Sequence, residues 1–143
     1  MRKLALDIGQ ARIGIAISQG SLSLPHSTLK NDDQALGQIL ELASDVDCIY
    51  IGLPLSLSGS HTKSTQMALD FAYELSQKTA TPIRMIDERL TSKSASEALY
   101  KAGKNSREQK GIIDASAAAM ILEFALNSER DGLAGKRLED IDA

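Results

Sequence analysis

One stretch near the start of the chain, LALDIGQARIGIAIS over residues 4–18, constrains the fold more than any other. Apolar side chains alternate on both sides of Gly9–Gln10–Ala11, which is the period-two pattern of two strands joined by a turn. One parity carries large aliphatic side chains, and the other carries small residues together with Asp7. A carboxylate in such a run is costly unless it is hydrogen-bonded, paired or bound to a metal. The stretch therefore predicts a hairpin and a candidate functional residue.

Asp7 also has an ordinary structural explanation. Asp and Gly are common turn formers, and Asp-x-Gly before a hairpin often does no more than shape the turn. The choice between a turn residue and a chemical group depends on what the rest of the chain brings to the same place.

The remainder of the chain alternates between strand-like and helix-like patterns. Three antiparallel strands followed by alternating helices and strands predict an α/β domain over residues 1–128, with a mixed five-stranded sheet and helices on both faces. Residues 129–143 are polar and charged, and they predict a flexible C-terminal tail. Strands are expected over 21–29, 48–53 and 83–86, and helices over 34–44, 62–78, from near Thr91, and over 111–127.

Composition narrows the class of protein. The chain has 143 residues and no apolar run near the ~20 residues that span a bilayer, so we expect no membrane association. Its single cysteine, Cys48, lies in an apolar run and indicates a buried thiol in a reducing cytoplasm. The net charge of −3 argues against a protein that binds nucleic acids strongly and without specificity. Residues 84–110 nevertheless hold seven bases against four acids, so a polyanion would approach that half.

Two further groups of acidic residues accompany Asp7. Asp87 and Glu88 end the strand IRMIDE, and because successive side chains alternate, only one of them can share a face with Asp7. Taken on their own, the two acids are better explained by a local acid–arginine pair at a solvated strand end. Asp114 begins the last helix, where capping and the helix dipole are the ordinary explanation. Its helical face continues in Ala118 and Leu122, which points it toward the sheet, and we expect the alanine-rich surface of this helix to cover the small parity of the hairpin.

Carboxylates that converge at one end of a mixed sheet favour a hard divalent cation such as Mg²⁺. Two such ions about 4 Å apart activate water and stabilise the departing oxygen during phosphodiester hydrolysis. Three bases flank the acids in sequence and are candidates for holding phosphates: Arg12, Arg89 and Lys110. The sequence shows no Ser–His–acid set and no Cys/His zinc spacing.

Four blocks of the sequence resemble the YqgF/RuvX family. LALDIGQARIGIAIS resembles its D-x-G-x-x-R-I-G-V-A opening, and IGLPLSLSG resembles its G-L-P-L…G segment. DERLTSKSA resembles its D-E-R-L-T/S box, and KGIIDASAAAMIL resembles its K-x-x-x-D-x-x-A-A-x-x-I-L closing helix. The blocks occur in order and span nearly the whole chain apart from the tail. Two positions depart from the pattern, Ala11 and Gln19, and neither is a proposed ligand.

The resemblance implies a ribonuclease H-like fold and a bacterial cytoplasmic nuclease that matures the 5′ end of pre-16S ribosomal RNA. It further implies kinship with Holliday-junction resolvases. Carried over by position, Asp7, Glu88 and Asp114 are the expected catalytic, metal-binding acids, with Mg²⁺ or Mn²⁺ as cofactor. The parity of the strand is compatible with Glu88 in this role, and it leaves a contribution from Asp87 open.

The leading hypothesis is therefore metal-dependent hydrolysis of structured RNA by a monomer or homodimer. Within the same fold, the alternative is a junction-specific DNA resolvase, which is expected to act as a symmetric dimer. A non-catalytic RNA-binding module is a different class, and it would tolerate loss of the acids. An ATP-using protein of the actin or sugar-kinase type also carries Asp-x-Gly, but it needs two such domains, and this chain is too short.

Overall fold

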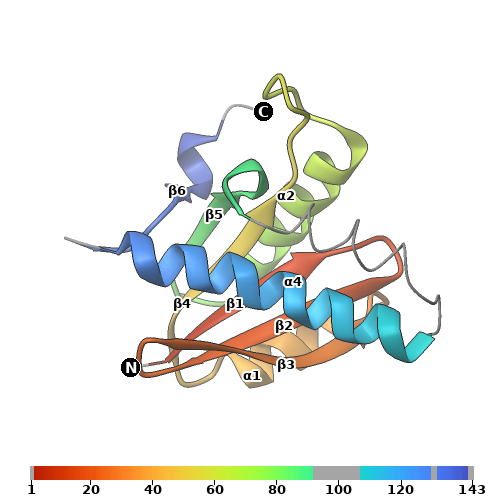
Figure 1. Cartoon of the computed structure of the whole chain (residues 1–143), viewed down its shortest axis with the longest axis vertical. Coiled ribbons are helices and arrows are strands. Elements are labelled where there is room, and N and C mark those ends of the chain that lie inside the picture. Colours follow the sequence, from red (N-terminus) through yellow and green to blue (C-terminus); the bar gives the residue numbers. More distant parts are fainter. Residues whose placement is uncertain (1, 92–106, 130–131, 142–143) are drawn as a thin grey trace.

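The computed structural model describes residues 2–91, 107–129 and 132–141 (Figure 1), with backbone only over 107–113. Its centre is a six-stranded mixed sheet in the order β3-β2-β1-β4-β5-β6. β1, β2 and β3 are antiparallel, β4 and β5 run parallel to β1, and β6 is antiparallel to β5. The strands are β1 (Arg2–Ile8), β2 (Arg12–Gln19), β3 (Leu22–Lys30), β4 (Val46–Leu53), β5 (Ile83–Asp87) and β6 (Lys136–Arg137).

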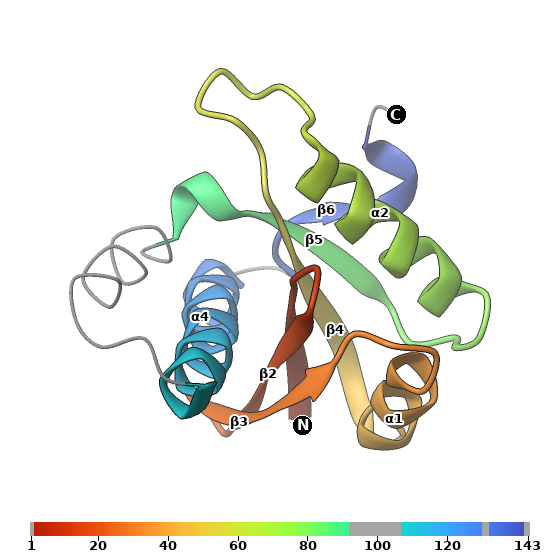
Figure 2. The same cartoon turned by 90° about the vertical axis from the view of Figure 1, so that its right-hand side faces the viewer.

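Helices cover both faces of the sheet, as the sequence predicts. Figure 2 shows α4 (Arg107–Ser128) on one face, with α1 (Ala35–Leu42) and α2 (Lys63–Ser76) on the other. Two short 3-10 turns complete the described part, η1 (Glu88–Leu90) and η2 (Leu138–Asp140). The helix expected from near Thr91 falls on residues 92–106, which lie outside the described residues.

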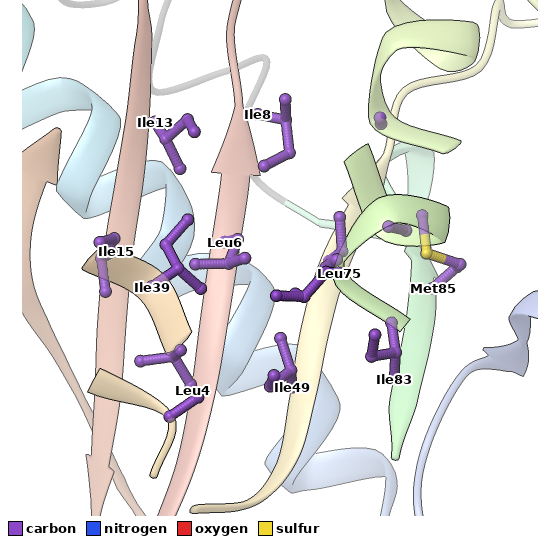
Figure 3. Packing of buried hydrophobic residues seen from close by; sticks show 14 of the residues in the cluster. Leu4, Leu6, Ile8, Ile13, Ile15, Ile39, Ile49, Leu75, Ile83 and Met85 are labelled. Carbon is purple, nitrogen blue, oxygen red and sulfur yellow. The ribbon is translucent and has the colours of Figure 1, made fainter. Parts of the chain in front are cut away.

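The hairpin divides the core into two halves, because its alternate side chains point to opposite faces. Leu4, Leu6 and Ile15 belong to the larger cluster, under α1 and α2 (Figure 3). Ala5 and Ala16 belong to the smaller cluster, under α4. The face of the hairpin that carries large side chains thus packs against α1 and α2, and the face that carries small side chains packs closely against α4.

The close approach of α4 depends on small residues on both partners. A Cβ atom placed on Gly14 of β2 would lie 1.9 Å from the carbonyl oxygen of Asp114 in α4. On the helix side, Ala118 and Ala125 are completely buried in the same cluster. This contact confirms the expectation that the alanine-rich surface of the last helix covers the small face of the hairpin.

The sheet has one strand more than the five predicted. β6 pairs with β5 through Arg84–Arg137 and Met85–Lys136. A two-residue strand in a polar stretch has no period-two pattern, so the sequence gives no signal for it. β6 and η2 lie within residues 129–143, where Ala134 is buried and Leu138 and Ile141 pack against the larger cluster. The flexibility of this stretch stays a prediction.

Cys48 is buried, as predicted, and burial raises the pKa of its thiol to about 12.

Among the helices in the described ranges, none is both long and apolar enough to cross a membrane.

A polar cluster under the C-terminal end of α4 fixes that end of the helix to the sheet. The hydroxyl of Tyr50 on β4 donates to the carboxylate of Glu129, and it accepts a hydrogen bond of 3.2 Å from the backbone N–H of Ala134. The ammonium group of Lys3 binds the same carboxylate at 2.6 Å. Burial and the bond to Glu129 both raise the pKa of Tyr50, so its hydroxyl keeps its proton.

We expect Tyr50→Phe to lower the free energy of unfolding by about 1–3 kcal/mol, because the buried N–H of Ala134 loses its acceptor and Glu129 loses a donor. Urea denaturation followed by circular dichroism measures this change. Tyr73→Phe is the matched control, because Tyr73 is 61% exposed and its substitution should change the stability by less than about 0.5 kcal/mol. Equal stability of the two variants would contradict the anchoring role of Tyr50.

Candidate active site

Asp7 lies near the end of β1, in the middle of the sheet, and only 6% of it is exposed. Its parity is that of Ala5, so its side chain is on the α4 face. Across the hairpin it pairs with Gly14. On the other side it is one residue beyond the pair Leu6–Ile51, so its neighbour on β4 is Gly52. Asp7 therefore stands between two positions that have no side chain.

The carboxylate of Glu88 occupies the space above one of these glycines. A Cβ atom on Gly52 would lie 2.5 Å from Oε1 of Glu88 and 2.6 Å from the Ile121 side chain of α4. Glu88 follows β5 in the parity of Ile86, which is buried under α4. Only 8% of Glu88 is exposed, and its carboxylate lies over Gly52, the β4 neighbour of Asp7, at the carboxyl end of the parallel strands.

Residue 114 occupies the space above the other glycine. The backbone of Asp114 lies against Gly14, directly across from Asp7. Its carboxylate Oδ2 accepts a hydrogen bond of 2.8 Å from Nε of Arg12. The side chains of Arg12 and Asp114 are 35% and 23% exposed. The third predicted acid is thus at the site, and its carboxylate is held by the guanidinium of Arg12, which belongs to the hairpin.

Asp87 has a separate partner. Its Oδ1 accepts from the backbone N–H of Arg89, which caps η1, and its Oδ2 pairs with Nη2 of Arg89 at 2.6 Å. Hydrogen bonds from Arg89 hold the pKa of this carboxyl below its usual range. Of the two acids between which the sequence left a choice, the structure puts Glu88 over Gly52 and gives Asp87 to Arg89.

Arg89 also reaches the loop that follows β4. Its Nη1 donates to the carbonyl oxygen of Leu57 at 3.4 Å. At Gly59, where φ is +85°, a Cβ atom would lie 3.2 Å from the same nitrogen. Arg89 therefore joins the loop to the turn that carries Glu88. The backbone of Lys110 lies in the first turn of α4, and its side chain is outside what is described.

Of the two glycines beside Asp7, Gly14 has the structural role that the sequence predicts, and the role of Gly52 was missed. Both lie inside an apolar strand, where a glycine signals a bulge or a close approach of another group. At Gly14 the expected group was the last helix, whereas nothing in CIYIGL indicates that Glu88 approaches Gly52.

The three acids supply the oxygen ligands that Mg²⁺ and Mn²⁺ favour. Over the described ranges, however, no three Asp, Glu, His or Cys side chains are grouped closely enough to form a ready-made metal site. The pairing of Asp114 with Arg12 is consistent with this, because it turns one of the three carboxylates toward a protein cation. The donor set suits a divalent cation once Asp114 exchanges its partner.

Comparison with known proteins gives the family. Residues 1–128 match the family described as "RuvX: Holliday junction resolvase". The chain belongs to the RuvX family. A relative from Clavibacter michiganensis named pre-16S rRNA nuclease is 44% identical over 90% of this chain and 84% of its own length. A relative of the same name from Leifsonia xyli is 40% identical over 90% of this chain and 86% of its own length. The predicted family is confirmed.

Solved structures confirm the predicted ribonuclease H-like fold. RuvC from Thermus thermophilus aligns with a TM-score of 0.52 at 14% identity, over 90% of this chain and 95% of RuvC. The same protein in complex with a Holliday-junction substrate aligns with a TM-score of 0.54 at 13% identity, over 90% and 94%. At these identities the likeness concerns the fold.

Substitution of the two site glycines should have unequal effects on stability. We expect Gly52→Ala to cost about 1–3 kcal/mol, because it displaces the movable end of Glu88 and an Ile121 methyl group. Gly14→Ala should cost more, because its Cβ meets the α4 backbone and the whole helix must shift. Chemical denaturation of both variants measures the difference.

Gly37→Ala is the control for these substitutions. Gly37 lies in α1 with nothing within 4 Å of an added Cβ, so this variant should gain up to about 1 kcal/mol from helix propensity. A Gly14→Ala protein as stable as the wild type would contradict the close contact between α4 and the hairpin.

Proposed function

We propose that this protein is a divalent-metal-dependent nuclease that hydrolyses a phosphodiester bond during maturation of the 5′ end of pre-16S rRNA. The observation that carries the proposal is the placement of Asp7 between two glycines, with the Glu88 carboxylate over one and Asp114 against the other. Two buried acids and a third partly buried one thus gather at the carboxyl end of a central strand, where their oxygens are suited to a divalent cation.

Asp7, Glu88 and Asp114 are the groups that would hold Mg²⁺ or Mn²⁺. The bound ions supply an activated water molecule and neutralise the charge on the departing oxygen. α4 covers one side of the acids and fixes their spacing from the sheet. Arg12, Arg89 and Lys110 are proposed to bind phosphates of the substrate, since Arg and Lys supply most phosphate contacts in nucleic-acid complexes.

RNA is favoured over DNA as the substrate by the names of the relatives, which refer to pre-16S rRNA. The description of the family favours a second candidate, resolution of four-way DNA junctions. Aromatic residues make up only 3% of the chain, so base stacking is a minor source of binding, and phosphate contacts and shape dominate with either substrate. A role in rRNA maturation places the protein in the cytoplasm, as a monomer or homodimer.

Each of Asp7→Asn, Glu88→Gln and Asp114→Asn should lower the rate of metal-dependent cleavage at least about 100-fold. Removal of groups that merely support a metal ligand already costs 10- to 100-fold, and a ligand should cost more. The measurement is single-turnover cleavage of a labelled precursor rRNA fragment with Mg²⁺ or Mn²⁺.

Asp87→Asn is the matched control for these variants. It changes the neighbouring acid of the same turn, whose partner is Arg89, so its rate should stay within a few-fold of wild type. Cleavage that persists in all three acid variants, or that persists in EDTA, would contradict the proposed mechanism.

The two substrate classes can be separated with the wild-type protein. We expect faster cleavage of the rRNA precursor than of a four-way DNA junction at equal salt and equal Mg²⁺, with unpaired RNA and duplex DNA as references. Salt must be held equal because phosphate contacts make the affinity for any nucleic acid fall steeply with ionic strength. Preferential cleavage of the junction would assign the protein to DNA resolution instead.

A further inference from the structure

Arg12 faces the candidate site from a fixed piece of backbone. It begins β2, and its carbonyl oxygen accepts a hydrogen bond of 2.9 Å from the N–H of Gly9 across the turn. The turn is also held by Asn31, the residue after β3, which donates its backbone N–H to the carbonyl oxygen of Ala11 at 3.0 Å and its side-chain amide to that of Gly9 at 2.7 Å. The backbone of Arg12 is thus fixed by hydrogen bonds across the turn, while its side chain is 35% exposed.

The present partner of that guanidinium is one of the acids expected to hold a cation. Nε of Arg12 lies 2.8 Å from Oδ2 of Asp114, a distance typical of a charge-assisted hydrogen bond. Arg12 has the parity of Gly14 and so stands on the same face as Asp7, two residues closer to the turn. A divalent cation shared by Asp7 and Asp114 would meet the positive charge of Arg12 at short range.

We propose that Arg12 is a positioning residue that competes with the divalent cation for Asp114, and that it is released to bind a substrate phosphate when the cation enters. The proposal rests on the nuclease function above and adds an order of events to it. Before the cation enters, Arg12 compensates the charge of Asp114. Once the cation takes over Asp114, the guanidinium has no carboxylate to hold and is displayed toward the nucleic acid.

This exchange makes the two binding events interdependent. A cation that releases Arg12 strengthens nucleic-acid binding, and by thermodynamic linkage nucleic acid then strengthens cation binding by the same factor. The exchange differs from a plain phosphate-binding role, in which loss of Arg12 would weaken substrate binding without affecting the affinity for the cation.

The first test measures Mn²⁺ binding to the protein without nucleic acid, by titration calorimetry and by the electron paramagnetic resonance of free Mn²⁺. We expect Arg12→Gln to bind Mn²⁺ about two- to fivefold more tightly than wild type, the effect of removing a partly exposed ion pair that competes with the metal. Asp114→Asn should bind Mn²⁺ more weakly than either protein.

Arg2→Gln is the matched control. Arg2 lies at the opposite end of the hairpin from Arg12 and pairs with Asp45 at 3.5 Å on the exposed surface. This variant removes one arginine and one ion pair from the same sheet, so its affinity for Mn²⁺ should equal that of wild type. Unchanged or weaker Mn²⁺ binding in Arg12→Gln would overturn the proposal.

The second test uses RNA binding and needs no catalysis. The affinity for the precursor fragment is measured against salt concentration with EDTA and with Ca²⁺, a hard cation that also takes oxygen ligands, on RNA shown to be intact afterwards. Release of one arginine to a phosphate should steepen the slope of log affinity against log salt by about 0.7–0.9 in wild type on adding Ca²⁺. Arg12→Gln should show no such change.

The two tests separate the inference from the function beneath it. Metal-dependent cleavage together with equal Mn²⁺ affinity in wild type and Arg12→Gln would contradict the proposed exchange and support the nuclease function. Absence of Mn²⁺ binding by the wild-type protein would contradict both. If Arg12→Gln does not fold, as judged by circular dichroism, the wild-type salt slopes decide: equal slopes with EDTA and Ca²⁺ overturn the proposal.

Discussion

The contact between Gly14 and the backbone of Asp114 is the interaction on which the rest of the site depends. It lets α4 approach the sheet more closely than any larger side chain on β2 would permit. Because Asp7 pairs with Gly14, the same contact brings together two acids that are far apart in the sequence. The packing of the smaller core and the assembly of the carboxylates therefore have one cause, so the site cannot form without the fold being nearly complete.

The two ends of α4 are held by different chemistry, and this difference suits their roles. At the C-terminal end, Tyr50 and Lys3 share the carboxylate of Glu129, and the side chains of Lys3 and Glu129 are only 15% and 18% exposed. Toward the N-terminal end, the carboxylate of Asp114 is held by Arg12, and this ion pair is more exposed. A helix fixed firmly at one end keeps its place on the sheet while the ion pair at the other end exchanges. The C-terminal end of α4 thus stabilises the fold, and the part near its N-terminal end carries the ion pair that can exchange.

The features of the fold and the site that could be predicted from the sequence are those that leave a local pattern in it, and contacts between distant residues leave none. The parity of the hairpin and of IRMIDE is a local pattern, and it correctly gave the faces of the sheet and the compatibility of Glu88 with Asp7. β6 left no trace, because two polar residues have no period. The ion pair of Arg12 with Asp114 joins residues 102 positions apart, and the spacing of neither motif could indicate it. Arg12 and Arg89 were expected to hold phosphates, whereas in the structure both hold a carboxylate. The pair of Arg89 with Asp87 is the local acid–arginine pair that the sequence also predicted.

That last difference bears on how a site with a net negative charge can accept a polyanion. Three carboxylates near one strand end would repel the phosphates of a nucleic acid, and two arginines paired with acids do little to offset that repulsion. A divalent cation adds its own positive charge to the site, and it leaves the guanidinium that Asp114 had bound able to face the phosphates. The cation should therefore precede the nucleic acid at this site. The order follows from the charges and from the partner of Arg12, and it would hold equally for an RNA or a DNA substrate.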